Sequence, residues 1–461
     1  MPRAAWKVAA ALLALLLLSS RSAVRATPID TPLPASVTAA LDALLACERP
    51  DGGWTYVCQQ GVRSWGATGI VNAAERLAGP LGLARWDLVV IRSPGTAAAG
   101  ELLLRGYRRS GRTAYLAAAT RAGDLLANLQ LSSGGWFSEV PVYDTRPALW
   151  FTAVVHWTTL DDDVTSGPIR LLLALWQETG IERYRETAER GLDFLLRAQL
   201  RSGAWPLTWR PAWMRALSPS FEDLPSLNDA ATASVITAML DGAGILGRDD
   251  LLEAACRGGD WLIRAQAGAP RAAWAQQYGG GGEPASGRRF ELPALASWET
   301  RYAVEALLAL AAATGDARYC APIPAALQWL AGATIGPGCW ARYYDPGSGE
   351  PFFVTADGRR VSSLGKARRG YAWIGDFGIP ALLADFGIEG TDGRSQPLRR
   401  YRLPGDSGVC VDERSSEDKI DSSLVRSRIA GAGVRLASAE SHPRRACYDA
   451  VAAAWRARPR D

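Results

Sequence analysis

Hydrophobic positions recur along this chain with the spacing of amphipathic helices. Ile169, Leu172, Leu173 and Trp176 lie at i, i+3, i+4 and i+7, which places their apolar side chains on one face of a helix. The segment 191–199 repeats this spacing. Both segments are therefore predicted to be amphipathic helices.

The predicted helices are joined into pairs by a repeat that ends in tryptophan. An apolar helical face runs into a turn of small residues and then a Trp, as in GLDFLLRAQLRSGAW at 191–205. The tryptophans of the last four units lie 66–69 residues apart and the first gap is 82 residues, enough for two helices. Because a single pair cannot bury its apolar face, the pairs must stack or close into a ring. We therefore predict an all-α fold, an α/α barrel (toroid) of repeated helix hairpins. The turn tryptophans are Trp54, Trp136, Trp205, Trp274 and Trp340.

The N-terminal segment departs from this repeat. Residues 1–26 combine a basic residue, an apolar run and small residues up to Ala26, the pattern of a secretory signal peptide. The run is too short to span a bilayer, and no later stretch has about 18 uninterrupted apolar residues. We expect a secreted or periplasmic protein with no integral membrane segment after signal cleavage.

The C-terminal segment departs from the repeat as well. Residues 391–461 are rich in Arg, Gly, Ser and acidic residues, and we expect a partly disordered tail of unknown role. One short helix is predicted within it, at 446–456. The barrel, with the catalytic groups, is then expected at 27–390.

Composition and cysteine content restrict the ligands. The net charge is only +4, and scattered basic residues argue against nucleic acid while leaving local patches for anions. The seven cysteines form no CxxC and only two histidines are present, so a structural zinc site is not expected. Because an exported protein meets an oxidising environment, disulfides can form. Separately, we expect the protein to be a monomer. The cysteines closest in sequence are Cys47 with Cys58, Cys320 with Cys339 and Cys410 with Cys447, which leaves Cys256 free.

Three polar clusters lie between the predicted helices, where the loops of a barrel gather. They are Asp161-Asp162-Asp163, Asn228-Asp229 and Arg288-Arg289-Phe290-Glu291. Three successive carboxylates repel one another unless a cation lies among them, and oxygen-only ligands suit Ca²⁺. The alternatives are that the acidic clusters cap helices and that the arginines form a surface ion pair with Glu291.

The turn tryptophans have two interpretations. Their rings could pack neighbouring repeats together, or they could offer flat faces on which sugar rings stack. Packing is favoured for most, because the position recurs in every repeat whereas a site is needed once. Trp205 and Trp274 are predicted to be the exceptions that contact a sugar.

A series of motifs between about residues 160 and 386 resembles, in kind and in order, that of the pectic acid lyases of polysaccharide lyase family 10. The fold of that family is a barrel of helix pairs. About half of the chain is covered. The motifs that carry the resemblance are Leu160-Asp161-Asp162-Asp163, Trp205-Pro206, Leu227-Asn228-Asp229-Ala230, Arg288-Arg289-Phe290-Glu291-Leu292-Pro293, Trp340-Ala341-Arg342-Tyr343-Tyr344 and Gly370-Tyr371-Ala372-Trp373.

The resemblance implies an activity and a site. Arg288 would be the catalytic base, and Asp161 and Asp229 would lie at a calcium and substrate site, to which we add Asp162. The reaction would be β-elimination of polygalacturonate or a related uronan, with Ca²⁺ stabilising the developing charge. The pKa of arginine lies above about 12, so an arginine can act as the base only where neighbouring groups lower that pKa. An arginine base also predicts that the activity is highest at alkaline pH.

The remaining predicted contacts are with the acidic polysaccharide. The guanidinium of Arg342 could bind a substrate carboxylate through two parallel hydrogen bonds. A structural salt bridge is an equal alternative for this residue. Asn228 and Glu291 are also assigned to substrate binding. Two other functions stay open: an α/α-barrel glycoside hydrolase with Asp161 and Glu291 as its carboxylate pair, or a catalytically silent carbohydrate-binding protein.

Overall fold

The apolar repeat folds into helix hairpins, each closed by a glycine. The computed structural model describes residues 33, 35–54, 87–143, 146–147, 157–388, 447, 449–451 and 453, so the predicted signal peptide and most of the predicted tail lie outside the described residues. In the four hairpins named below, the first helix ends at a glycine with φ near +70°, a left-handed conformation that favours glycine. The hairpins are α4 (Thr96–Ser110) with α5 (Thr113–Asn128), α7 (Ser166–Thr179) with α8 (Glu182–Ala198), α10 (Ala231–Leu246) with α11 (Asp249–Ala265), and α12 (Ser297–Thr314) with α13 (Ile323–Gly332).

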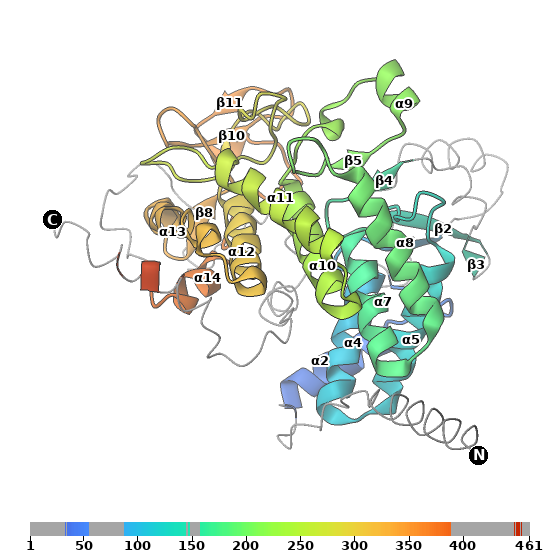
Figure 1. Ribbon diagram of the computed structural model, residues 1–461. Coiled ribbons are helices and arrows are strands. Elements are labelled where there is room, and N and C mark those ends of the chain that lie inside the picture. Colours follow the sequence, from blue (N-terminus) through green and yellow to red (C-terminus); the bar gives the residue numbers. More distant parts are fainter. Residues whose placement is uncertain are drawn as a thin grey trace, which may run out of the picture.

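The hairpins lie side by side in two layers. In one layer α4 contacts α7, α7 contacts α10 and α10 contacts α12; in the other, α5 contacts α8 and α8 contacts α11. The inner helix α10 is buried around most of its circumference, whereas α8 and α11 bury one face and expose the other. Figure 1 shows these pairs following one another across the molecule. The predicted all-α fold of the α/α-barrel type is confirmed.

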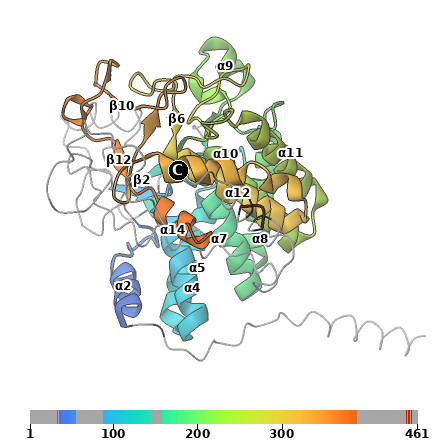
Figure 2. The ribbon, with the colours of Figure 1, turned by 90° about the vertical axis from the view of Figure 1, so that its left-hand side faces the viewer.

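Short strands and long loops gather at one end of the helix layers, which both Figure 1 and Figure 2 show. All strand pairs are antiparallel. The strands are β1 (Asp87–Val90), β2 (Glu139–Tyr143), β3 (Arg146–Pro147), β4 (Thr158–Thr159), β5 (Thr208–Trp209), β6 (Leu295–Ala296), β7 (Thr334–Gly336), β8 (Cys339–Ala341), β9 (Tyr343–Tyr344), β10 (Pro351–Val354), β11 (Arg360–Val361) and β12 (Ile374–Gly375). The remaining elements are α2 (Ala35–Ala46), α9 (Ala212–Leu217), η2 (Phe221–Asp223), η3 (Asn228–Ala230), η4 (Ala317–Cys320), η5 (Leu364–Lys366) and α14 (Ile379–Asp385).

The turn tryptophans join one repeat to the next. Each indole N–H donates to a carbonyl near the end of the helix before it, at 2.7–2.9 Å. In four repeats the tryptophan backbone N–H also donates to a threonine hydroxyl at the start of the next inner helix, at 3.0–3.3 Å. All five rings are buried. The four threonines are Thr96, Thr165, Thr232 and Thr300.

This burial corrects one prediction. Trp205 and Trp274 have 0% of their surface exposed, so neither ring can lie against a sugar. The prediction that these two residues contact a substrate is wrong, because they occupy the same packing position as the other turn tryptophans. The preference for packing was right in every repeat.

Within the part of the chain that the structure describes, one helix is long and apolar enough to cross a membrane. The segment Asn228–Leu246 passes by length and composition, but 61% of its apolar window is buried inside the barrel. Its apolar character therefore reflects its place in the inner layer.

A C-terminal segment packs against the barrel. Cys447 forms a disulfide with Cys320 in η4, and both Cys447 and Val451 belong to the main hydrophobic core. The cysteines closest in sequence, Cys320 with Cys339 and Cys410 with Cys447, are therefore not the ones that pair. Cys256 is a free thiol, as expected.

Candidate active site

The three polar clusters converge at the end of the barrel where the inner helices begin. Asp161, Asp162 and Asp163 precede α7, and Asn228 and Asp229 form η3 just before α10. The backbone N–H of Asp162 donates to the carbonyl of Asp229 at 2.9 Å, which ties the two loops together.

The backbone of this region is strained. Asp162, Asp163, Asp229 and Ala230 have φ values of 50°, 60°, 45° and 68°. Such left-handed conformations cost non-glycine residues about 1–3 kcal/mol each and persist where the surrounding structure enforces them. The strain sets the direction in which the aspartate side chains leave the backbone.

Three carboxylates meet in this cluster. Oxygen atoms of Asp161, Asp162 and Asp229 all lie within 4.8 Å of one another, and the side chains are half-buried. Burial, with the neighbouring charge of Asp229, raises the pKa of Asp161 to about 7. Beside them, the buried Oδ1 of Asn228 has no hydrogen-bond partner among the described residues. These oxygen donors fit a calcium ion, which accepts six to eight oxygen ligands.

The helix-capping alternative does not hold for the acidic clusters. Neither α7 nor α10 has a side-chain cap at its first turn. The Thr165 hydroxyl, at the cap position of α7, donates to the carbonyl of Thr159 instead. The aspartates before these helices are therefore directed toward one another and toward basic side chains.

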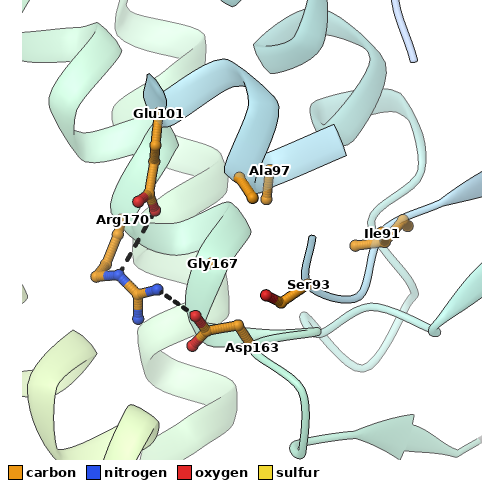
Figure 3. A pocket seen from close by; sticks show the side chains of 8 residues that line it. Ile91, Ser93, Ala97, Glu101, Asp163, Gly167 and Arg170 are labelled. Atoms are coloured by element: carbon orange, nitrogen blue, oxygen red, sulfur yellow. Dashed lines mark hydrogen bonds and ion pairs between the residues drawn. The ribbon is translucent and has the colours of Figure 1, made fainter. Parts of the chain in front are cut away.

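Asp163 is not part of the carboxylate triad and pairs instead with the half-buried Arg170. Figure 3 shows Arg170 of α7 reaching toward Asp163 and Glu101. Its Nη2 donates to Asp163 Oδ2 at 2.8 Å, and its Nε lies 3.6 Å from Glu101 Oε1. The adjoining cavity of about 10 Å³ has room for one water. Arg170 thus anchors the acidic loop to the inner helices.

Arg342 lies beneath Asp229. Its Nη2 is 3.0 Å from Asp229 Oδ1 and 3.3 Å from Glu299 Oε1, and only 1% of the residue is exposed. Its guanidinium lies 4.9 Å from the ring of Trp298 and 4.6 Å from that of Tyr371. Of the two roles left open by the sequence, the structure shows the salt bridge.

Arg288 is the accessible cation of the site. Its side chain is 48% exposed and forms an ion pair with Glu291, whose Oε2 also accepts the Arg288 backbone N–H at 2.8 Å. Burial lowers the pKa of Arg288, but the hydrogen bond and charge of Glu291 outweigh it and raise that pKa above its ordinary value. The sequence analysis required neighbours that lower this pKa, so the structure differs on this point.

Two other predicted substrate contacts lie below the surface. Glu291 is 3% exposed and, besides Arg288, accepts a hydrogen bond from the hydroxyl of Tyr371 at 3.1 Å. Asn228 is 2% exposed, and its amide donates to Asp229 Oδ2 at 2.8 Å. Both residues hold the accessible groups in place, which corrects their assignment to direct substrate contact.

One basic residue of the site was missed. Arg92 follows β1, and its Nη1 lies 3.7 Å from Asp162 Oδ2 while its Nη2 lies 3.3 Å from Glu139 Oε1. It comes from the N-terminal part of the chain, outside the motifs of the family resemblance. No local pattern marks it, because only the folding of β1 against the acidic loop brings it there.

Residues 145–336 match the model of the pectic acid lyase family. The class of the protein is therefore that of the polysaccharide lyases. Within that class, the match confirms the resemblance to the pectic acid lyases.

Several solved structures are similar to the chain. The family 10 polysaccharide lyase from Cellvibrio cellulosa is 21% identical, with a TM-score of 0.47, over 57% of this chain and 91% of that chain. A mutant of that lyase in complex with trigalacturonic acid is 20% identical, with the same TM-score and coverage. The cellobiose 2-epimerase from Spirochaeta thermophila is 17% identical, with a TM-score of 0.42, over 57% of this chain and 64% of that chain. Among proteins of curated function, none matches the chain.

Proposed function

We propose that this protein is a secreted or periplasmic lyase that cleaves polygalacturonate or a related uronan by calcium-assisted β-elimination. One observation carries the proposal: three carboxylates from two separate loops converge beside an accessible arginine. The family match over residues 145–336 supports the same reaction class. The signal-peptide pattern at 1–26 supports the location, and the protein is proposed to act as a monomer.

Asp161, Asp162 and Asp229 are proposed to hold the metal. Burial first, and then the neighbouring charge of Asp229, raise the pKa of Asp161, so the ionised cluster is unfavourable without a cation. Arg342 keeps Asp229 in position from below. When bound, Ca²⁺ would supply Lewis-acid stabilisation of the negative charge that develops on the substrate carboxylate.

Arg288 is proposed to remove the proton at C5 of the uronate ring. The electron pair of the broken C–H bond forms the C4–C5 double bond, and the glycosidic oxygen at C4 leaves. Glu291 orients the guanidinium and also stabilises its protonated form. Because a base must first lose its proton, the rate should rise toward alkaline pH.

The glycoside hydrolase is disfavoured by the state of Glu291. Burial raises the pKa of Glu291, but the hydrogen bond and charge of Arg288 outweigh it and lower that pKa below its ordinary value. The lowered pKa is unsuited to a general acid, and both the acid and the base of a hydrolase need access to the substrate. Glu291 lacks that access in either role, being 3% exposed.

The test is incubation of the mature protein with polygalacturonate across pH 6–11. We expect an ultraviolet-absorbing unsaturated uronide, loss of its formation with a chelator, and recovery on adding Ca²⁺. Arg288→Ala should reduce the rate by about 10²–10⁴-fold. Arg289→Ala removes the same charge from the neighbouring exposed position and should retain activity. Reducing sugar without ultraviolet absorbance would indicate a hydrolase and refute the lyase; no turnover on any of several uronans would refute catalysis.

A further inference from the structure

A basic cavity of about 180 Å³ lies between the end of α8 and the loop that carries α9. It opens at the same end of the barrel as the carboxylate triad, where Figure 1 shows α9 projecting from the body. Its charged and aromatic lining residues are Arg197, Arg201, Trp209, Arg210, Arg215 and Asp223. Four arginines face a single aspartate, so the cavity has an excess of positive charge.

Two of these arginines have structural partners and two are available. Arg210 donates from Nε to Asp223 Oδ1 at 2.9 Å, and Arg197 donates to the carbonyl of Ser133 at 2.9 Å. Within the described part of the chain, no carboxylate pairs with the exposed side chains of Arg201 and Arg215. Their charges therefore remain available to an anionic ligand from solution.

The aromatic residue of the cavity is fixed in position. Trp209 is half-buried and packs edge-on against Phe194, with ring centroids 5.5 Å apart and an interplanar angle of 87°. A held aromatic ring beside guanidinium groups combines a surface for a sugar ring with donors for its carboxylate. The volume is below the roughly 300–1,000 Å³ of sites for larger ligands, so it suits a single sugar residue.

The cavity is connected to the candidate active site through two elements. Thr208 in β5 pairs with Thr159 in β4, which leads directly to Asp161. In η2, Asp223 lines the cavity while its neighbour Glu222 interacts electrostatically with both Asp161 and Arg288. The loops that line the cavity are therefore direct neighbours of the loop that carries Asp161.

We propose that this cavity is a further subsite, which binds a uronate residue of the same acidic polysaccharide away from the bond that is cleaved. Arg201 and Arg215 would contact the uronate carboxylate, and Trp209 would lie against the ring. The inference rests on the proposed function for the identity of the polymer. It concerns binding, and turnover is not needed to test it.

The first test measures kinetics with Arg201→Gln, Arg215→Gln and the double variant. Each substitution should raise KM for polygalacturonate about three- to fivefold, the double variant about tenfold or more, and kcat should stay within twofold. A control, Arg109→Gln, removes an exposed charge at the far end of α4 and should change neither. An unchanged KM in the double variant, or an equal rise in the control, would overturn the subsite.

The second test measures binding without catalysis. In a native gel containing polygalacturonate, the wild-type protein should be retarded and the double variant much less so, while the control migrates like the wild type. If the double variant loses retardation and the wild type forms no unsaturated product, the result would support the subsite and refute the proposed lyase. Equal retardation of wild type and double variant, or the same loss in gels with an unrelated polyanion such as dextran sulfate, would refute a uronate subsite.

Discussion

At the residue scale, three charged groups of the site each pair with a less exposed partner of opposite charge. Glu291 lies against Arg288, Arg342 lies beneath Asp229, and Arg170 holds Asp163. Separating such a pair would leave a desolvated charge without a partner, which costs much free energy. The two side chains are therefore held in one geometry. The buried partners therefore determine both where the accessible groups point and how easily they change protonation state.

Replacing Glu291 by Gln should move the pH profile of the lyase to lower pH. Glu291 raises the pKa of Arg288 by its hydrogen bond and its charge, so a neutral Gln of the same shape should lower that pKa. Since Arg288 acts in its deprotonated form, the rising limb of kcat against pH should shift down by about one to three pH units. The measurement is kcat from pH 6 to 11.

The control for this shift lies in the preceding loop. Glu283→Gln removes the same charge from an exposed position and should leave the profile unchanged. A rising limb that stays in place or moves to higher pH in Glu291→Gln would contradict the role of Arg288 as the base.

The site shows what residue patterns alone can and cannot predict. Asp161, Asp162 and Asp229 were singled out because the loops of a rigid scaffold often carry sites, and because neighbouring carboxylates repel one another unless a cation lies among them. Glu291 was given the wrong role because its polar side chain was assumed to be exposed, and burial depends on Tyr371, which follows 80 residues later in the chain. Arg92 could not be found, because its neighbour Asp162 is distant in sequence.

At the element scale, the barrel is held together by the turn that follows each hairpin. In the α8 turn, Trp205 donates from its indole to the carbonyl of Leu195 at 2.8 Å and from its backbone to Thr232 Oγ1 at 3.1 Å. One residue thus bonds to an outer helix behind it and an inner helix ahead of it. The repeat predicted this packing role, but not its partner threonines, because their spacing from the tryptophans varies from 26 to 42 residues.

Replacing Thr232 by Val should destabilise the protein by about 1–3 kcal/mol. Valine has nearly the same shape, but it leaves the buried backbone N–H of Trp205 without an acceptor. The change is measured as the free energy of unfolding in urea. Thr237→Val is the matched control in the same helix: the Thr237 hydroxyl bonds only to carbonyls of its own helix, so its loss should cost less than about 0.5 kcal/mol. Equal effects of the two changes would argue against the inter-repeat bond.

At the scale of the whole molecule, the repeat predicts the barrel but not how the chain ends. Helical spacing and the recurring tryptophans are local features, and they were sufficient for the fold class. The packing of Cys447 and Val451 into the core was not predicted, because a short apolar segment within a polar tail gives no sign of a distant partner. The disulfide with Cys320 joins residues 127 positions apart in sequence.

Removing this disulfide should reduce stability without impairing the active site. A covalent link across 127 residues restricts the unfolded chain, and the loop-closure model gives a stabilisation of about 4–5 kcal/mol for such a length. The double variant Cys320→Ala/Cys447→Ala should therefore unfold at a clearly lower temperature. The disulfide lies at the opposite end of α12 from the active site: Glu299 is in the first turn of α12, whereas Cys320 is in η4, which follows the last turn. The value of kcat at 25 °C should therefore stay within twofold.

Cys256→Ala is the control: it alters the free thiol and should change the free energy of unfolding by less than about 1 kcal/mol. A double variant as stable as the wild type would show that the C-terminal segment contributes nothing to the barrel, and a loss of kcat in fully folded protein would place it in the active site.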